Sequence, residues 1–159
     1  MKNDKNLRIA LCISGQLRTY RDCYKNLYKY LIKQYNTDIF VHTWTQVGSS
    51  HKEKDILIED VVSEQQVKSF YKAKAVVVEN FSNKYFDELD GVNLPVILKE
   101  LEPSHSKTVL PMFYKMKKCD NLRQAYEKNN NFKYDFVIRI RPDLKLMSYI
   151  PKYVFQNKN

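Results

Sequence analysis

The sequence predicts an α/β domain with a doubly wound, mostly parallel sheet, and three observations support this fold class. Short apolar runs recur along the chain, at residues 8–14, 38–41, 73–78 and 136–140. Apolar residues at helical spacing lie between these runs. The chain has 159 residues, of which 43% are hydrophobic, enough for one domain with a sizeable core. We therefore expect a single α/β domain over residues 1–159.

The first half of the chain predicts two strands with a helix between them. Residues 8–14 (RIALCIS) are typical of a buried strand. Apolar residues then recur at intervals of four, three and four, which predicts a helix over 20–34 with Thr19 as N-cap and Asn36 as stop. The run DIFV at 38–41 predicts the second strand, which leads into a polar loop at 46–54.

The second half continues the alternation. Ser63 and Gln66 form a capping-box pattern, which predicts a helix over 64–71. The run at 73–78 predicts a third strand, and a helical pattern covers 110–128 before the last strand. The segment between them, 80–108, contains Gly91, Pro95 and Pro103, and we expect an irregular excursion there.

The chain is basic, with 27 Lys and Arg against 18 Asp and Glu and a formal charge of +9. This charge favours anionic partners, although the lysines are dispersed as on a solvated surface and do not favour nucleic acid. The three cysteines form no CxxC pair, so we expect reduced, buried thiols in a cytoplasmic protein. The first residues are too polar for a leader peptide and no run is long enough for a membrane span, which leaves peripheral contact at the inner face of a membrane.

The segment 134–144 (YDFVIRIRPDL) is the most informative motif. Strand side chains alternate, so Val137, Arg139 and Arg141 are expected on one face of a buried strand. Buried guanidinium groups need anionic partners, and Pro142 places Asp143 just beyond the strand, at the edge where α/β sheets bind ligands. The motif predicts an anion site, and the structural alternative is a salt bridge between these arginines and Asp143 or Asp135.

Two other predicted strands also end in residues that can contact a ligand. The first leads into Ser14, Gly15, Gln16 and Arg18, where a glycine permits close approach and an arginine can reach a phosphate. The second leads into His42, Thr43 and Trp44. Neither GxGxxG nor a P-loop motif occurs, and the alternatives are an ordinary turn and a core-edge aromatic.

The helix before the arginine strand supplies two further cationic candidates. Lys115 and Lys118 share a helix face at i, i+3 and could add to a phosphate site. Lysines at such positions also occur on the solvated side of an amphipathic helix, and Lys117 is assigned to that side.

Taken together, LCISGQLRTY, DIFVHTW, YKMKKCDNLRQAYE and YDFVIRIRPDL resemble a family of bacterial and viral glycosyltransferases associated with capsule and lipopolysaccharide assembly. The resemblance covers about residues 8–44 and 112–146. It implies a GT-A-like, Rossmann-like domain that binds a nucleoside-diphosphate sugar and transfers the sugar to a glycan or lipid-linked acceptor. Acceptor-binding elements of such folds usually come later in the chain, so the resemblance also allows the donor-binding part of a longer protein.

The resemblance also implies roles for individual residues. The strand resembling FVIRIR ends in a metal-binding DxD motif in such folds, whereas this chain has Arg141-Pro142-Asp143 with one acid. Two alternatives follow: Asp143 holds Mg²⁺ or Mn²⁺, or Arg139 and Arg141 neutralise the leaving diphosphate without metal. The residues of the other two strand ends, with Lys115 and Lys118, would bind the substrate.

A non-catalytic protein is the competing class. A basic, tyrosine-rich α/β module can bind a nucleotide or single-stranded nucleic acid without turnover, because cationic grooves and aromatic side chains suit both ligands. No RNA-binding motif of a known class accompanies the composition.

Overall fold

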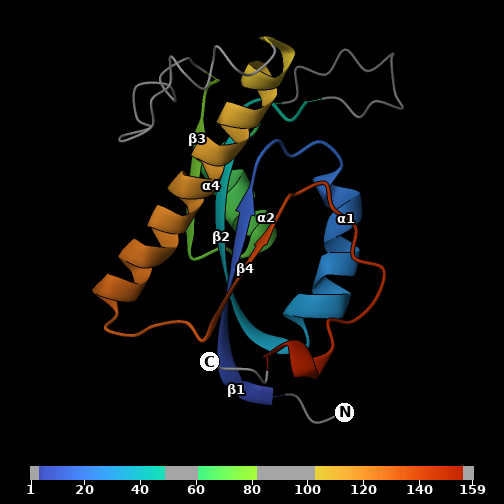
Figure 1. Cartoon of the computed structure of the whole chain (residues 1–159), viewed down its shortest axis with the longest axis vertical. Helices are drawn as coiled ribbons and strands as arrows, with labels where there is room; N and C mark the ends of the chain where they lie inside the picture. The colour runs from blue at the N-terminus through green and yellow to red at the C-terminus, as the bar shows by residue number, and fades with distance from the viewer. Residues whose placement is uncertain (1–3, 49–60, 82–102, 156–159) are drawn as a thin grey trace.

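The computed structural model describes residues 4–48, 61–81 and 103–155, and in this part four parallel strands form one sheet. The strands are β1 (Asp4–Ser14), β2 (Tyr35–Trp44), β3 (Ala75–Glu79) and β4 (Phe136–Ile140). Their order is β3-β2-β1-β4, and every pair is parallel (Figure 1). The strand order therefore reverses between β1 and β4, a position where open α/β sheets bind ligands.

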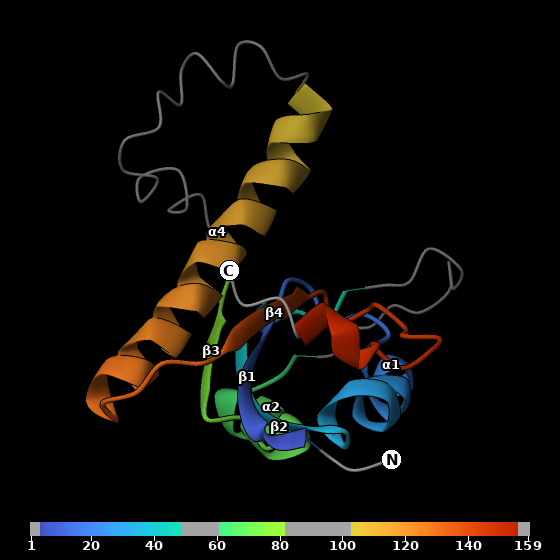
Figure 2. The same ribbon diagram turned by 60° about the horizontal axis from the view of Figure 1, so that its bottom comes forward.

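Helices cover both faces of this sheet. Helix α1 (Tyr20–Leu27), its π-helical continuation η1 (Tyr28–Ile32) and α2 (Glu64–Tyr71) lie on one face. The long helix α4 (Pro103–Asn129) crosses the other face, as Figure 2 shows, and a short 3₁₀ helix, η3 (Lys152–Phe155), lies near the end of the chain. The predicted α/β class with a parallel sheet is confirmed. No helix in the described ranges is long and apolar enough to cross a membrane.

The strands divide their side chains between two cores. Ile9, Leu11 and Ile13 of β1 point toward α1 and α2 and are fully buried in the larger core. The alternate residues Ala10 and Cys12 point toward α4, where a smaller core also contains Phe40, Cys119 and Tyr134. Burying a large aliphatic side chain contributes roughly 1.5–3 kcal/mol, so the two cores hold the helices against the two faces of the sheet. All three cysteines are free and buried, as predicted.

Helix α2 has the predicted bounds because its ends are specified locally. The Ser63 hydroxyl accepts a hydrogen bond from the Gln66 amide at 3.2 Å, and the Gln66 side chain accepts one from the Ser63 amide at 2.8 Å. Lys72 ends the helix in the left-handed conformation at φ 52°. The capping box is confirmed.

The prediction of a buried arginine strand is wrong. Strand β4 pairs with β1 alone among the described strands and lies at the edge of the sheet. Phe136, Ile138 and Ile140 pack against the larger core, as the alternation predicted, but Val137 is 48% exposed and Arg139 is exposed. Helix α4 packs mainly on β1 and β2. The side of β4 that carries Val137 and Arg139 therefore remains open to solvent.

Several predicted boundaries also differ from the structure. The helix predicted over 20–34 becomes π-helical at Tyr28, and Asn36 lies inside β2, which begins three residues before the predicted Asp38. Strand β3 spans 75–79 and not 73–78. Helix α4 begins at Pro103, so residues 103–108 of the predicted irregular segment are helical. Proline fits the first helical position, where no amide donor is needed. Residues 82–102 of that segment and 49–54 of the predicted polar loop lie outside the described residues.

Candidate functional site

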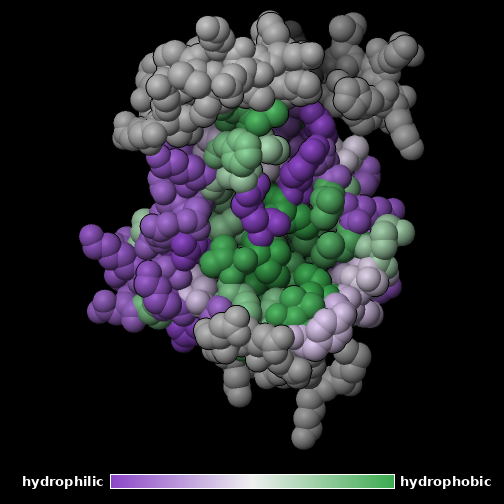
Figure 3. All heavy atoms as spheres, viewed as in Figure 1, coloured by the Kyte–Doolittle hydropathy of each residue, from purple (hydrophilic) through white to green (hydrophobic). Residues whose placement is uncertain are grey.

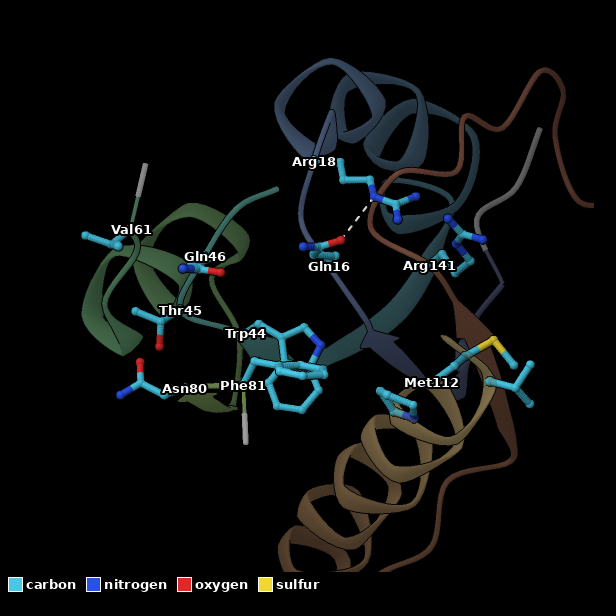
Figure 4. Close-up of a pocket in the computed structure, with 12 residues that line it drawn as sticks. Gln16, Arg18, Trp44, Thr45, Gln46, Val61, Asn80, Phe81, Met112 and Arg141 are labelled. Carbon is cyan, nitrogen blue, oxygen red and sulfur yellow. Dashed lines mark hydrogen bonds between the residues drawn. The ribbon is translucent and has the colours of Figure 1, made fainter. Parts of the chain in front are cut away.

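A cleft of about 790 Å³ lies at the carboxyl ends of the strands (Figure 4). Gln16, Arg18 and Arg141 form one part of its wall, and Trp44 and Phe81 form another. The remaining described lining residues are uncharged: Thr45, Gln46, Val61, Asn80, Val109, Pro111 and Met112. The two arginines are therefore the charged groups among the described lining residues. Such a wall suits a ligand with an anionic group and a flat or apolar group.

The turn after β1 is held against the end of β2. Gly15 has φ 122°, a conformation that side-chain-bearing residues rarely adopt, and its amide donates to the His42 carbonyl at 3.2 Å. The Thr43 hydroxyl donates to the Gly15 carbonyl at 2.8 Å. Arg18 has φ 42°, and its amide donates to the Val47 carbonyl at 2.8 Å. Thr43 thus supports the turn from the buried side of the strand, where it is fully buried.

Asp143 lies between two guanidinium groups. Arg141 donates to it through Nε at 2.9 Å and Nη2 at 2.7 Å, while Arg18 Nη1 lies 3.3 Å from Asp143 Oδ2. Burial of Asp143 acts to raise its pKa, but the hydrogen bonds and charge of Arg141, with the charge of Arg18, outweigh burial and lower it. The predicted salt-bridge alternative for the motif is therefore present, and it joins β4 to the turn after β1.

The backbone around Asp143 forms a tight turn. The Leu144 amide donates to the Arg141 carbonyl at 3.2 Å, and Pro142 occupies the second position of the turn. Proline favours that position because its ring fixes φ near the value required. The turn therefore ends β4 and directs Asp143 back toward Arg18.

Arg139 lies apart from this cluster. It is opposite Cys12 in the β1–β4 register, it is exposed, and it is not among the lining residues of the cleft. The two arginines at i, i+2 were predicted to act together on a diphosphate. In the structure the partner of Arg141 is Arg18, which lies far from it in sequence but on the neighbouring strand end.

Lys115 lies behind the cleft wall and not on its surface. Its side chain is fully buried, and Nζ donates to the Thr43 carbonyl at 2.9 Å and to Glu79 Oε1 at 2.6 Å. The same atom lies 3.3 Å from the centre of the Trp44 ring. Burial lowers the pKa of Lys115 to about 8, against the hydrogen bond and charge of Glu79, which act to raise it. Lys115 is thus a buried support for Trp44.

Trp44 is itself mostly covered. It is 7% exposed, its ring is stacked on Tyr114 at 6.3 Å, and the Phe81 ring meets it edge-on at 5.1 Å. Phe81 is 54% exposed and lines the cleft beside it, as Figure 4 shows. The exposed aromatic surface at this end of the cleft therefore comes mainly from Phe81, which the sequence analysis did not select.

Three other predicted contacts lie around α4 and the strand ends and are not among the lining residues of the cleft. Ser14 is 5% exposed at the end of β1. His42 is 3% exposed, and burial, with the charges of Lys115 and Lys118, lowers its pKa to about 3. Its Nδ1 atom is buried and has no hydrogen-bond partner within the described ranges of the chain. The Lys118 Nζ atom lies 5.4 Å from the centre of the Tyr114 ring.

The cleft offers poor ligands for a divalent cation. Within the described residues no group of three or more His, Cys, Asp or Glu side chains is placed to hold a metal ion. Both carboxylate oxygens of Asp143, the predicted metal ligand, already accept hydrogen bonds from arginines. Mg²⁺ and Mn²⁺ prefer several oxygen ligands, so these residues do not fit such an ion as they stand.

Three residues at the end of β3 were not predicted as part of the site. Glu79, Asn80 and Phe81 come at the end of β3, just as His42 and Trp44 come at the end of β2. These residues also follow the predicted end of the strand at residue 78, but residues 80–108 were assigned to an irregular excursion and were not considered as strand-end contacts. Met112 and Pro111 carried no comparable signal, because their place over the cleft depends on where α4 crosses the sheet.

Figure 3 shows the molecular surface as viewed in Figure 1. Hydrophobic residues gather in the centre of this face, and hydrophilic residues lie over α4.

Comparison with curated proteins gives no match, and comparison with solved structures gives none. One protein family matches residues 4–159, nearly the whole chain, and its description is domain of unknown function (DUF7796). The chain therefore belongs to the DUF7796 family.

Proposed function

We propose that the cleft binds a nucleoside-diphosphate sugar and that the protein is a GT-A-like glycosyltransferase acting on a glycan or lipid-linked acceptor. The observation that carries this proposal is the pairing of Arg18 and Arg141 in one wall of a cleft whose other wall exposes Phe81. Guanidinium groups match the geometry of phosphate oxygens, and an aromatic face suits a nucleobase or sugar. The cleft also lies where the strand order reverses, a common ligand position in such sheets.

The chemistry assigned to these residues is stabilisation of the leaving group. Sugar transfer breaks the bond between the anomeric carbon and the diphosphate oxygen, and negative charge develops on that oxygen. Arg18 and Arg141 would stabilise this charge, since fixed cationic donors act most strongly where charge appears in the transition state. The acceptor hydroxyl forms the new bond to the anomeric carbon, and its proton passes to an oxygen of the leaving diphosphate. Gln16 would orient the Arg18 guanidinium toward the diphosphate, because its side-chain oxygen accepts a hydrogen bond from Arg18 Nε at 3.3 Å.

A panel of ligands scored by thermal stabilisation tests the proposal. Nucleoside-diphosphate sugars should raise the melting temperature, because a ligand that binds only the folded state stabilises it by mass action. The free sugars and the uncharged nucleosides should not, since they lack the diphosphate that the two arginines would bind. Product formation with the best donor would then be followed by release of the nucleoside diphosphate. A protein that none of the nucleotide sugars stabilises would contradict the proposal.

A second candidate function is binding of a nucleotide without turnover. One observation favours it: the described lining residues include no carboxylate, histidine, cysteine or lysine that could accept the proton of an acceptor. Stabilisation by nucleoside diphosphates, with no release of product from any donor and acceptor pair, would support this candidate over the transferase. A steep salt dependence of oligonucleotide binding would instead indicate a nucleic-acid ligand.

A further inference from the structure

The carboxylate of Asp143 lies at the point where two guanidinium groups of the cleft converge. Its Oδ2 atom is 2.7 Å from Arg141 Nη2 and 3.3 Å from Arg18 Nη1, and its Oδ1 atom is 2.9 Å from Arg141 Nε. Arginines bind a phosphate group in the same geometry: two oxygens lie along one edge of a guanidinium, and a second guanidinium lies beside them. The carboxylate therefore resembles two oxygens of a phosphate in both position and charge.

We propose that the Asp143 carboxylate occupies the position of a phosphate group, and that a diphosphate ligand displaces it from Arg18 and Arg141 without the help of a divalent cation. This inference rests on the proposed function, since it concerns the regulation of the same site. It assigns Asp143 the role of an internal competitor and not that of a metal ligand or a catalytic group.

The two arginines are accessible to such a ligand. The side chain of Arg141 is 55% exposed and that of Arg18 is 31% exposed, and both line the cleft, whereas the Asp143 side chain is 13% exposed and is not among the lining residues. Ion pairs at partly exposed positions contribute little to stability, so their exchange for another anion is easy. A diphosphate carries more negative charge than a carboxylate and offers more acceptor oxygens to the same donors.

The exchange also requires little movement of the backbone. Asp143 belongs to the turn closed by the hydrogen bond from the Leu144 amide to the Arg141 carbonyl, and Pro142 in that turn is buried. Rotation of the Asp143 side chain alone would separate its oxygens from the guanidinium groups. Arg18 would remain in place, because its backbone is held by Val47 and its Nε donates to Gln16.

The test uses inorganic pyrophosphate as the probe, with binding to the full chain followed by titration calorimetry in EDTA and again in Mn²⁺. Asp143→Asn keeps the size of the side chain but removes its charge, and Asp22→Asn, on the exposed face of α1, is the control that removes the same charge elsewhere. We expect Asp143→Asn to bind pyrophosphate about fivefold more tightly than the wild type in EDTA, which corresponds to the roughly 1 kcal/mol of an exposed ion pair. Asp22→Asn should bind within about twofold of the wild type.

Two further conditions make the result specific. The gain should persist at about 0.5 M salt, where the Debye length is only a few ångströms and charges that do not touch the ligand are screened. The gain should also be the same in EDTA and in Mn²⁺. Unchanged or weaker binding by Asp143→Asn would overturn the inference, since the carboxylate would then orient the arginines. Binding that requires Mn²⁺ in the wild type and is lost in Asp143→Asn would overturn it in favour of a metal ligand.

Nucleoside diphosphates titrated in parallel separate this inference from the proposed function. If the wild type binds them but Asp143→Asn does not bind pyrophosphate more tightly, the competitor role is wrong and the nucleotide site remains. If neither protein binds nucleoside diphosphates or pyrophosphate, while circular dichroism shows both to be folded, the inference and the proposed function are both wrong.

Discussion

The ammonium group of Lys115 lies 3.3 Å from the centre of the Trp44 indole ring, inside the protein. The sequence suggested that both residues would contact a ligand, but in the structure one supports the other. Cation–π contacts between desolvated groups contribute about 2 kcal/mol, more than those at exposed sites. Glu79 and the Thr43 carbonyl complete the environment of the ammonium group. The wall of the cleft at Trp44 therefore depends on a charged side chain from α4.

Replacing Lys115 by methionine should lower the free energy of unfolding by about 2–4 kcal/mol, because the cation–π contact is lost and Glu79 loses its buried partner. Urea denaturation followed by the fluorescence of the single tryptophan, Trp44, measures the effect. Lys117→Met, on the exposed side of the same helix, is the matched control and should change stability by less than about 0.5 kcal/mol. Equal effects of the two substitutions would show that Lys115 has no special structural role.

The stability of the protein should fall on acidification through His42. Its pKa is about 3 in the folded protein, against 6.5 in the unfolded chain, so the unfolded state binds more protons between these values. The contribution is fully present above pH 6.5 and is lost as the pH falls toward 3. At roughly 1.4 kcal/mol per pH unit, this group should make the protein about 2 kcal/mol less stable at pH 5 than at pH 7.

Denaturation of the wild type and His42→Phe at both pH values measures this difference. The variant has no titrating group at this position, and its ring can still pack near Tyr114, whose ring centre lies 6.1 Å from that of His42. The loss of stability between pH 7 and pH 5 should be smaller in the variant by about the amount given above. The same loss in both proteins would assign the acid sensitivity to other groups.

Glu127 should be a strong determinant of stability that is independent of the cleft. Its carboxylate is 2% exposed and accepts hydrogen bonds from the Tyr134 amide at 2.9 Å and Lys133 at 2.9 Å, and it pairs with Arg123 at 2.8 Å. Glu127→Ala leaves the buried Tyr134 amide without its acceptor and leaves the mostly covered Arg123 with Asp120 as its remaining partner among the described residues, and it should cost about 3 kcal/mol.

Lys133→Ala is the control for Glu127, because Lys133 pairs with the same carboxylate but its side chain is 81% exposed. This substitution should cost less than about 1 kcal/mol, as is usual for exposed ion pairs. Neither substitution should change the affinity for a nucleoside diphosphate once the protein is folded. A loss of affinity in folded Glu127→Ala would show that the end of α4 is coupled to the cleft.

Local features of this fold can be predicted from the sequence, whereas long-range features cannot. The bounds of α2 were predicted correctly because Ser63 and Gln66 specify its start within four residues of sequence. The edge position of β4 was not predicted, since strand order depends on contacts between distant segments and FVIRI is apolar enough for a central strand. Alternation along β4 was nevertheless correct, because the pleat alone determines it.

The candidate site shows the same distinction. The turn residues Gly15 and Arg18 and the turn at Asp143 were selected correctly as neighbours, since parallel strands bring their carboxyl ends to one edge. Lys115 was expected at that edge as a ligand contact, because helical spacing places residues on a face but does not determine whether that face is exposed. Phe81 was not selected, although it lies three residues after the predicted end of that strand, because residues 80–108 were assigned to an irregular excursion.

The central claim is that Arg141, with Arg18, binds the diphosphate of a nucleotide. Titration calorimetry with the nucleoside diphosphate that gives the largest thermal stabilisation tests it most directly, on the wild type, Arg141→Ala and Arg139→Ala. Arg139 is the matched control because it lies two residues before Arg141, is exposed and is not among the cleft residues. Arg141→Ala should weaken binding by about tenfold or more, as expected for loss of charge-assisted hydrogen bonds, and Arg139→Ala by less than about twofold. Equal affinities of the wild type and Arg141→Ala, or a larger loss in Arg139→Ala, would contradict the account.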